Sequence, residues 1–544
     1  MIARSGLALL AALLVPAAAP LSVYVVGPLA RVHAADAPGT VTEARLKASR
    51  NEVEAFQLVV RAGEGGLKGV KVEISDLKGE TRSIERANIA LYREQFIALK
   101  TPSPKSKEGP GVYPDALIPE IIPPPTGETP AAPAAPPRVR AMPFAVPAGL
   151  SQPLWIEVRV PKDAAPGDYM GTVKVSADGE KPVEVPVTLT VWDFVLPDTP
   201  SLRTNFGGLG RRLLTGHPGL KPDTPGYRKL ERNYAASMAA HRICPPIPPY
   251  LRPKMAADGG IDPKETHAAL KEWIETFHVT SIPITLIGND PAGKDREVNV
   301  KFLKSTWAYL QENGWEKLAY VWVLDEPNVQ AQYDEVRRRA KMVHETQPGL
   351  KVMCTEQPTP QDPAWGSLVG SVDLWVPLWS LYDEESVAER QKAGEEAWSY
   401  TALCEGGKGK DTPFWQLDFP LLNYRIPGWM SRRYGLRGLL YWTVVFWPES
   451  DPWINPLTYK QAYNDEGVLF YPGTPAGVDG PVESLRLKAL RDGLEDYEYL
   501  VLAGDAGAVK ATELAKSWTS WETDPAKLAA AREELAAIIV AKKK

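Results

Sequence analysis

The sequence predicts a multidomain protein of the β plus α/β class, with an N-terminal β-sandwich, a (β/α)8 barrel of the TIM type and a C-terminal helical segment. Three patterns predict this order. Residues 20–197 contain runs in which apolar and polar side chains alternate, which is typical of half-buried antiparallel strands. Residues 198–478 alternate short apolar runs with helix-length stretches, as parallel sheets covered by helices do. Residues 479–544 place apolar side chains at spacings of three and four, which indicates helices.

The composition is that of a folded soluble protein. The chain has 544 residues, which is too long for one ordinary domain, and 24% of them are charged. The formal net charge is −5 with both signs spread along the chain, so we expect no nucleic-acid partner. The 17 Trp residues favour carbohydrate binding, because Trp stacks on sugar rings, although Trp also fills large cores. The three cysteines lie far apart and indicate no disulfide framework.

The N-terminus has the pattern of an export signal over residues 1–19. One positive charge, Arg4, precedes a short apolar run over residues 6–15, and residues 17–19 form an A-x-A cleavage pattern. Pro16 breaks the apolar run too early for a comfortable membrane span. We therefore expect a periplasmic or extracellular protein with no integral membrane span after cleavage. A retained N-terminal anchor is the alternative.

The first domain, residues 20–197, is expected to be an immunoglobulin-like sandwich of two antiparallel sheets. Residues 154–160 and 183–191 show the alternation most clearly, and residues 161–167 have the chemistry of a turn that joins two strands. A Pro/Ala-rich segment, residues 101–147, is expected to form an extended surface insertion.

The second domain, residues 198–478, is expected to close into a barrel of eight parallel strands. Stretches of helical composition, such as residues 333–345, separate the apolar runs, and the length of the domain suits eight β/α units. The expected strands, in chain order, are residues 204–207, 242–245, 282–287, 319–324, 351–355, 372–378, 414–417 and 439–445.

The third part, residues 479–544, is expected to form helices packed on the barrel. Its first helix carries four charged residues at helical spacing, namely Arg491, Asp492, Glu495 and Asp496. We interpret them as structural, because charges at this spacing form ion pairs that dock a helix onto its neighbour. Arg50 and Glu52 in the first domain have the same interpretation.

The most informative segment is residues 317–327 (KLAYVWVLDEP), in which an apolar strand runs directly into two carboxylates. This is the fourth expected strand, so Asp325 and Glu326 fall at the C-terminal face of the barrel, where barrel enzymes place their active sites. Two carboxyls in different environments can divide the tasks of holding a proton and holding a negative charge, as glycosidic cleavage requires. The alternative is that Asp325 caps the following helix and Glu326 pairs with a surface arginine.

Five aromatic residues fall near the expected barrel mouth and are candidates for walls of a sugar-binding site. They are Trp379, Tyr382, Trp415, Trp442 and Trp447. Packing in the core or in loops is the alternative for each of them. The six histidines show no metal-ligand spacing, and no nucleotide-binding or nucleophile-elbow motif occurs, so we expect neither a metal nor a cofactor.

Four sequence blocks, in this order, resemble a known family. They are residues 48–57 (ASRNEVEAFQ), 322–327 (WVLDEP), 438–442 (GLLYW), and 484–486 (SLR) leading into 491–499 (RDGLEDYEY). Together they are similar to glycoside hydrolase family 123, known for β-N-acetylgalactosaminidases. The resemblance covers nearly all of the chain after the signal.

The resemblance implies a β-sandwich followed by a (β/α)8 barrel and a retaining mechanism assisted by the substrate. In that mechanism the 2-acetamido oxygen of the substrate attacks the anomeric carbon and forms an oxazolinium ion. The family's adjacent carboxyl pair matches Asp325, which would orient the acetamido group, and Glu326, which would protonate the leaving oxygen and later activate water. The implied substrate is a glycan that ends in β-N-acetylhexosamine, foremost β-GalNAc.

Two other hypotheses remain open at this point. The protein could be a glycosidase of different sugar specificity that uses another carboxylate partner, for example Glu356 or Asp418. It could also be a carbohydrate-binding protein without activity, although the intact pair Asp325 and Glu326 argues against this. The sequence predicts neither the oligomeric state nor the linkage that is cleaved.

Overall fold

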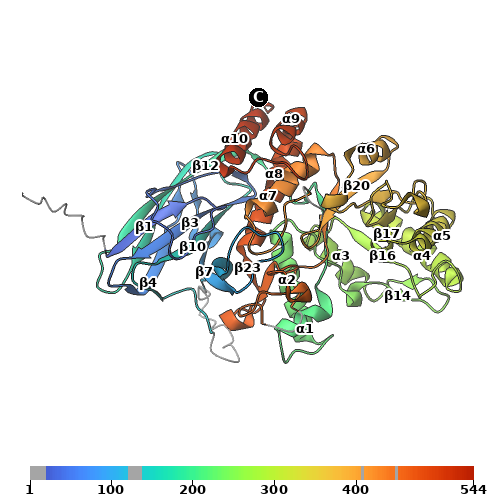
Figure 1. Ribbon diagram of the computed structural model, residues 1–544, viewed down its shortest axis with the longest axis horizontal. Coiled ribbons are helices and arrows are strands. Elements are labelled where there is room, and N and C mark those ends of the chain that lie inside the picture. The colour runs from blue at the N-terminus through green and yellow to red at the C-terminus, as the bar shows by residue number, and fades with distance from the viewer. Residues whose placement is uncertain (1–19, 121–137, 406–409, 448–450, 544) are drawn as a thin grey trace, which may run out of the picture.

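The computed structural model describes residues 20–120, 138–405, 410–447 and 451–543. The expected export signal lies outside these ranges. Figure 1 shows a β-rich part in blue at one end, an α/β part in green and yellow at the other, and red C-terminal helices between them. None of the described helices combines the length and hydrophobicity that crossing a bilayer requires.

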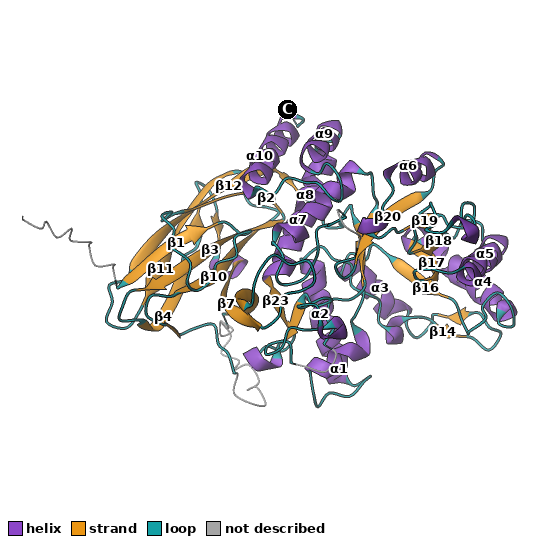
Figure 2. Ribbon diagram, viewed as in Figure 1, coloured by secondary structure: helices purple, strands orange, loops and turns teal. Residues whose placement is uncertain are grey.

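Two antiparallel-rich sheets of the described chain form the N-terminal sandwich (Figure 2). The first sheet contains, side by side, β1 (Leu21–Val26), β3 (Glu52–Ala62), β10 (Ser151–Val160), β7 (Ile89–Leu99) and β8 (Gly111–Pro119). The second contains β2 (Ala44–Arg50), β12 (Val183–Val195), β11 (Gly167–Ser176), β4 (Leu67–Ile74) and β9 (Phe144–Val146), with the short β5 (Leu77–Lys78) and β6 (Ser83–Ile84) at one side. Alternate residues, such as Leu154, Ile156 and Val158, are fully buried between the sheets, as their period of two predicts.

The expected surface insertion at residues 101–147 is wrong in part, because it contains two strands of the sandwich. β8 pairs with β7 over most of its length and is largely buried, and β9 pairs with β4. The prolines that suggested an irregular segment lie where the ladder tolerates them: Pro114 occupies a register shift opposite Phe96. Residues 121–137 of this segment lie outside the described ranges.

The first sheet also receives two strands from the far end of the chain. β22 (Phe470–Pro472) pairs with β23 (Pro481–Ser484), and β23 pairs with β8. The chain therefore returns to the sandwich after the α/β part, and the expected domain boundary at residue 478 falls between two strands of one sheet. Strand pairing between distant segments gives no local sequence signal, which is why the boundary was misplaced.

The α/β part contains a seven-stranded parallel sheet within the described residues. Its spatial order is β13 (Arg203–Phe206), β21 (Gly438–Tyr441), β20 (Glu396–Thr401), β19 (Leu374–Trp375), β18 (Val352–Cys354), β17 (Ala319–Leu324) and β16 (Ile282–Thr285). The accompanying helices are α1 (Leu213–Gly216), α2 (Pro225–Ala240), α3 (His267–Thr276), α4 (Arg296–Glu312), α5 (Gln330–Thr346), α6 (Glu384–Lys392) and α7 (Leu422–Arg433), with a hairpin of β14 (Lys254–Met255) and β15 (Ile261–Asp262).

Two of the expected barrel strands are wrong. Residues 414–417 form no strand. β20 occupies the position next to β21 in the sheet, and its sequence EAWSYT contains too many polar residues to be recognised as an apolar run. Residues 242–245 also form no strand. They lie between the sheet edges, where the Cys244 amide donates to Thr204 Oγ1 at 2.7 Å and Ser281 Oγ donates to the Thr204 carbonyl at 2.7 Å. Hydrogen bonds that involve side chains, rather than backbone pairing of strands, thus connect the region of β13 with that of β16, the two outer strands of the sheet. A closed (β/α)8 barrel is not confirmed.

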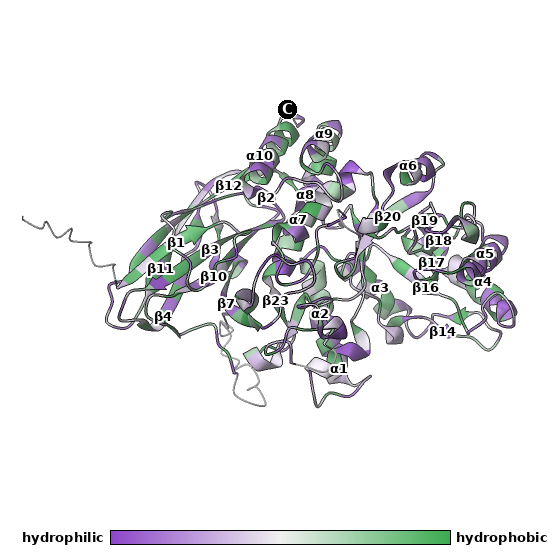
Figure 3. Ribbon diagram, viewed as in Figure 1, coloured by the Kyte–Doolittle hydropathy of each residue, from purple (hydrophilic) through white to green (hydrophobic). Residues whose placement is uncertain are grey.

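The parallel sheet is curved, with one face enclosed by its own strands. Tyr320, Met353, Leu374, Trp398 and Leu440 come from five neighbouring strands and meet in one buried cluster on the concave face. The alternate residues of β17 pack outward against helices α4 and α5. Figure 3 shows the same division, with hydrophobic strands inside and hydrophilic outer faces on these helices.

The C-terminal helices α8 (Leu485–Leu502), α9 (Asp505–Leu514) and α10 (Pro525–Ala541) lie between the two parts (Figure 1). α8 is buried along nearly its whole length rather than on one face. Arg491 contacts Glu157 of the sandwich at 2.7 Å, and Asp496 contacts Arg425 of α7 at 2.7 Å. The charges interpreted as structural therefore dock the helix onto the sandwich as well as onto the α/β part.

Candidate active site

Asp325 and Glu326 form the bend that directly follows β17. Both residues are exposed, and Glu326 has a φ of 43°, a left-handed backbone conformation that non-glycine residues rarely adopt. Helix α5 begins later, and its N-cap residue Val329 makes no side-chain cap bond. Among the described residues, neither carboxylate takes part in an ion pair. The alternative of a helix cap and a surface ion pair is therefore not what the structure contains, and the strained backbone is of the kind found at functional sites.

Thr355, the residue after β18, holds both members of the pair. Its hydroxyl donates to Asp325 Oδ1 at 2.7 Å and accepts from the backbone N–H of Glu326 at 2.9 Å. The parallel register, in which Leu324 lies opposite Cys354, brings the two strand ends together. One side chain thus fixes the orientation of the Asp325 carboxylate and the backbone of Glu326.

Tyr400 at the end of β20 contacts Glu326 from across the sheet. Its hydroxyl donates to Glu326 Oε1 at 2.5 Å. β20 is three strands from β17, which in a flat sheet would separate them by about 14 Å at the usual strand spacing. The bond exists because both side chains lie on the concave face. Burial, and then the charge of Glu326, raise the pKa of Tyr400 well above its ordinary range, so the phenol remains a donor.

Further carboxylates surround this pair. Glu356 follows Thr355 and is buried, which raises its pKa to about 7. Glu466, fully buried, accepts from Trp442 Nε1 at 2.7 Å and from the Tyr441 hydroxyl at 3.3 Å. Partial burial and the charges of Glu326 and Glu466 raise the pKa of Glu405. Several carboxyl groups therefore gather at the C-terminal edge of the sheet.

Of the five aromatic residues expected at the mouth, Trp442 contacts these carboxyl groups, through its hydrogen bond to Glu466. Trp379 is 2% exposed, stacks on Trp518 at 4.8 Å and donates to Ser399 Oγ at 3.0 Å. Trp415 is equally buried and stacks on Tyr424 at 5.2 Å. These two residues belong to the core under the helices, and the expectation that they face a sugar is wrong.

Trp447 and Tyr382 are also packed away from the carboxyl pair. Trp447 is 4% exposed and donates to the Phe470 carbonyl at 3.0 Å. Tyr382 packs on Tyr434 at 4.8 Å and on Trp518. A residue that follows a strand in the sequence can face the C-terminal end of the sheet or pack among the helices, and its place in the sequence does not distinguish the two. This is why the expectations for Trp447 and Tyr382 failed.

The substitution Trp379→Ala is therefore expected to act on stability. Removing a buried Trp costs about 3–5 kcal/mol of unfolding free energy. Chemical denaturation measures this loss, and Trp442→Ala serves as the matched control, with a smaller loss because Trp442 is only half-buried. Wild-type stability of Trp379→Ala combined with weakened substrate binding would contradict the assignment of Trp379 to the core.

Sequence reasoning missed Thr355, Tyr400 and Glu466. Thr355 and Tyr400 each lie at the C-terminal end of a parallel strand, and recognising β20 would have placed Tyr400 at the mouth. The two alternative carboxylate partners separate clearly. Glu356 adjoins the pair, whereas Asp418 accepts from the backbone and hydroxyl of Ser103, both at 2.7 Å, and is buried as a structural acceptor.

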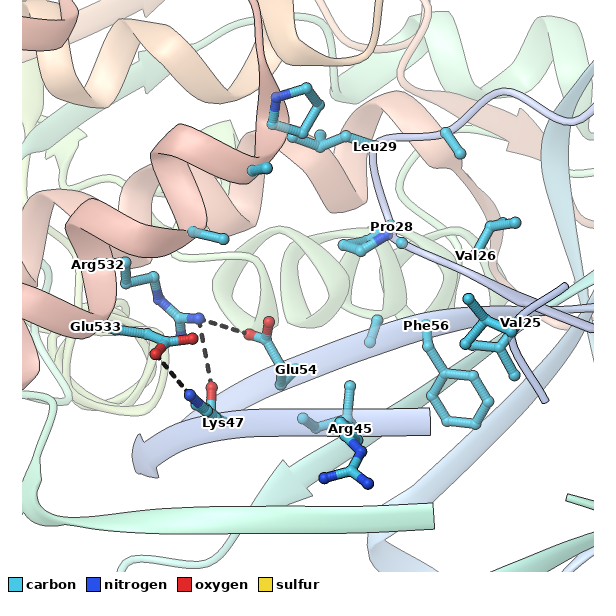
Figure 4. A pocket seen from close by; sticks show the side chains of 18 of the residues that line it. Val25, Val26, Pro28, Leu29, Arg45, Lys47, Glu54, Phe56, Arg532 and Glu533 are labelled. Atoms are coloured by element: carbon cyan, nitrogen blue, oxygen red, sulfur yellow. Dashed lines mark hydrogen bonds and ion pairs between the residues drawn. The ribbon is translucent and has the colours of Figure 1, made fainter. Parts of the chain in front are cut away.

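No group of three His, Cys, Asp or Glu side chains is arranged to hold a metal ion within the described residues. A cavity of about 740 Å³ lies elsewhere, between β1, β2, β3 and α10 (Figure 4). It is bordered by the ion pairs of Lys47 with Glu533 at 2.5 Å and of Arg532 with Glu54 at 3.2 Å. This cavity belongs to the junction of the sandwich with the last helix and does not include the carboxyl pair.

Comparison with solved structures identifies the same architecture. A family 123 glycoside hydrolase from Clostridium perfringens, described for glycolipid glycan hydrolysis, matches with 15% identity and a TM-score of 0.68, over 96% of this chain and 97% of its own. A glycoside hydrolase family 5 xyloglucanase from Bacteroides ovatus matches far more loosely, with 10% identity and a TM-score of 0.31 over 87% of this chain and 100% of its own. At 15% identity the Clostridium protein shows the fold alone.

Two family models match the sequence itself. The glycoside hydrolase 123 catalytic domain matches residues 270–503, and the glycoside hydrolase 123 N-terminal domain matches residues 32–177. No curated protein matches the chain in sequence. Because the two models together cover well over half of the residues, in the order of the observed domains, the chain belongs to glycoside hydrolase family 123.

Proposed function

We propose that the protein is an exported retaining glycosidase that removes terminal β-N-acetylhexosamine, foremost β-GalNAc, by substrate-assisted catalysis. One observation carries the proposal: two adjacent carboxylates at the end of β17 are held by different donors, Asp325 by Thr355 and Glu326 by Tyr400. Separate partners allow separate tasks. A glycan substrate is further supported by the Clostridium relative, whose description concerns glycolipid glycans.

The proposed reaction assigns one step to each carboxyl group. Asp325, as a carboxylate, accepts a hydrogen bond from the acetamido N–H and orients the carbonyl oxygen toward the anomeric carbon. That oxygen forms a bond to the carbon while the bond to the leaving oxygen breaks, and Glu326 gives its proton to the leaving oxygen. Water then adds to the anomeric carbon and gives a proton to Glu326. The oxazolinium ring opens, which restores the acetamido group, and the configuration at the anomeric carbon is retained.

Adjacency of the two carboxyls favours this mechanism over a covalent enzyme intermediate. A nucleophile and an acid must lie on either side of the glycosidic bond, with the carboxyl groups about 5–5.5 Å apart in retaining enzymes. Neighbouring residues whose side chains emerge from one bend are poorly placed for that. When the substrate supplies the nucleophile, both carboxyls can act from the same side of the sugar.

Hydrolysis of an aryl β-GalNAc glycoside by the wild type and by Asp325→Asn tests the proposal. We expect turnover by the wild type, a large loss in the variant, and inhibition by a thiazoline that mimics the oxazolinium ion. An active enzyme that the thiazoline fails to inhibit would support a glycosidase of different mechanism. Glycan binding without cleavage across a broad panel would support a carbohydrate-binding protein.

The substitution Tyr400→Phe removes one hydrogen bond to Glu326 and keeps the ring in place. A hydrogen bond to a charged group is worth about 1.5–3 kcal/mol, so kcat is expected to fall about 10- to 100-fold. Steady-state kinetics measure the effect. Tyr309→Phe is the matched control, because its hydroxyl bonds His267 on the helical layer, and it should leave kcat unchanged. Equal kcat values for Tyr400→Phe and the wild type would remove Tyr400 from the site.

Export is part of the proposal and rests on the N-terminal sequence pattern alone. Expression with the complete N-terminus, followed by N-terminal sequencing of the protein recovered outside the cytoplasm, tests it. A mature chain that begins at Pro20 is the expected result. An uncleaved chain in the membrane fraction would support the retained anchor instead.

A further inference from the structure

We infer that Arg212 binds an anionic group, a carboxylate or a sulfate, on the part of the glycan that leaves during hydrolysis. The inference rests on the proposed function, because the proton donor Glu326 defines which part of the glycan leaves. The preferred substrate is then an acidic glycan, in which the β-N-acetylhexosamine is linked to a sugar that carries negative charge. Three features support this: the way Arg212 is held, its lack of a partner, and its place relative to Glu326.

The guanidinium of Arg212 lies over two aromatic rings at the C-terminal edge of the parallel sheet. Its central carbon is 5.8 Å from the ring centre of Trp442 and 5.7 Å from that of Phe446. Trp442 is itself fixed, because its indole N–H donates to the buried carboxyl of Glu466 at 2.7 Å. Two half-buried rings thus support the exposed guanidinium.

Two glycines bring the loop that leads to Arg212 against the strand end that carries Trp442. A Cβ at Gly207 would lie 2.4 Å from the Trp442 carbonyl oxygen. A Cβ at Gly208, whose φ is 107°, would lie 2.1 Å from Thr443 Oγ1. Because only glycine permits so close an approach at this φ, the backbone itself fixes the loop beside Trp442. The position of Arg212 over the indole therefore follows from tight packing and is not that of a freely moving surface side chain.

Arg212 has no anionic partner in the described part of the chain. Its side chain makes no hydrogen bond and no ion pair there, and the same holds for the neighbouring Arg211. Arg232 shows the contrasting arrangement: it also lies over a Trp and a Phe ring, but it pairs with Glu272 at 2.5 Å. A guanidinium presents its N–H donors as a planar fork that matches the oxygen pairs of an anion. The fork of Arg212 is therefore free for an anion that the chain does not supply.

The place of Arg212 relative to the carboxyl pair assigns it to the leaving-group side. Glu326, the proposed proton donor, contacts Tyr400 of β20 at 2.5 Å. β21 pairs with β20 and is directly followed by Trp442, and β13, on the other side of β21, leads into the loop of Arg212. Asp325, which would hold the acetamido group, is bonded instead from β18, farther from β21 in the sheet. The leaving oxygen, which must lie against Glu326, is thus on the side of Trp442 and Arg212.

The surrounding carboxyl groups make an acidic leaving group depend on Arg212. Asp325 and Glu326 are exposed at the same edge of the sheet and repel a negative group on the substrate. Without a cation an acidic glycan would therefore bind more weakly than a neutral glycan of the same shape. Arg212 reverses this order by pairing with the negative group.

The ratio of kcat/KM for an acidic and a neutral substrate tests the inference. The substrates are β-GalNAc linked to glucuronic acid, to sulfated glucose and to glucose by the same bond, so that only the charge of the leaving sugar differs. We expect Arg212→Gln to lower the acidic-to-neutral ratio about 10- to 100-fold. A fall confined to the uronate supports a carboxylate ligand, and a fall confined to the sulfated sugar supports a sulfate. An unchanged ratio for both would overturn the inference.

Arg232→Gln is the matched control, and Arg212→Lys is a second variant. Arg232 lies over its Trp and Phe rings at 5.9 Å and 5.1 Å, but on helix α2, so its replacement should leave the ratio as in the wild type. Lysine keeps the charge without the planar fork, so Arg212→Lys should retain part of the ratio. If Arg212 served only to pack on Trp442, Arg212→Gln would lower the activity on all three substrates alike, a result that would overturn the inference.

Calorimetric titration with the intact disaccharides separates this inference from the proposed function. In the background of Asp325→Asn, which should leave the substrates uncleaved, adding Arg212→Gln should weaken binding of the acidic disaccharide more than that of the neutral one. If the wild type cleaves no glycoside but binding shows this difference, the proposed function fails and the anion site stands. If the wild type cleaves the neutral substrate and neither rate nor binding of the acidic one depends on Arg212, the anion site fails and the proposed function stands.

Discussion

The substitution Glu326→Gln is expected to lower kcat/KM for an aryl β-GalNAc glycoside by about 10²- to 10⁴-fold, the usual contribution of a positioned general acid. Glutamine keeps the position of the side chain and can still accept from the Tyr400 hydroxyl. It cannot give a proton to the leaving oxygen or take one from water. The loss is therefore a loss of proton transfer rather than of folding or substrate binding.

Leaving-group dependence separates this role from a general defect. A dinitrophenolate leaves without protonation, so the first step of Glu326→Gln should be nearly normal with that substrate and severely slowed with a poor leaving group. Glu275→Gln, an exposed carboxylate on α3, is the control and should behave as the wild type. An equal loss with both leaving groups would contradict the acid role of Glu326.

The substitution Arg486→Ala is expected to cost about 3–5 kcal/mol of unfolding free energy, as removal of one partner from a buried ion pair does. Arg486 is 0% exposed, and its guanidinium contacts Asp115 at 2.8 Å and Asp465 at 3.0 Å. Asp115 belongs to β8 of the sandwich, whereas Asp465 precedes β22. Without the arginine, two buried carboxylates that join distant segments lose their main cation.

Denaturation by urea at two pH values measures this effect. Burial raises the pKa of Asp465 to about 7, so the protonated fraction of Asp465 increases as pH falls below 7. The destabilisation by Arg486→Ala should therefore be smaller at pH 5 than at pH 8. Arg82→Ala is the control, since Arg82 pairs with Asp163 at the surface and should change little. A small effect of Arg486→Ala at pH 8 would contradict the proposed importance of the cluster.

The location of the carboxyl pair could be predicted from sequence because β17 is a strong apolar run that ends abruptly in charge. β20 was missed for the opposite reason. Ser399 and Thr401 interrupt its apolar pattern and are nevertheless buried, and Ser399 Oγ accepts a hydrogen bond from Trp379 Nε1. The contribution of Tyr400 was lost together with that strand.

The aromatic residues show what spacing along the chain cannot supply. Trp379 and Trp442 both follow strands of the parallel sheet, yet Trp379 stacks on Trp518 of the C-terminal segment and Trp442 donates to Glu466. Both of these partners lie more than twenty residues away along the chain. A local pattern predicts that such side chains are large and partly buried, and it does not predict which partner covers them.

The sequence by itself determined the order of the parts, most strands of the parallel sheet, and the bend that carries Asp325 and Glu326, because these depend on local periodicity and on residues adjacent in the chain. Only the tertiary structure decided which groups hold the pair. Thr355 reaches it because β18 pairs with β17, and Tyr400 reaches it because the sheet curves and brings the ends of non-adjacent strands together. The return of β22 and β23 to the sandwich was decided in the same way, since backbone pairing between distant segments is specified by the packing of the whole and leaves no mark on either segment alone.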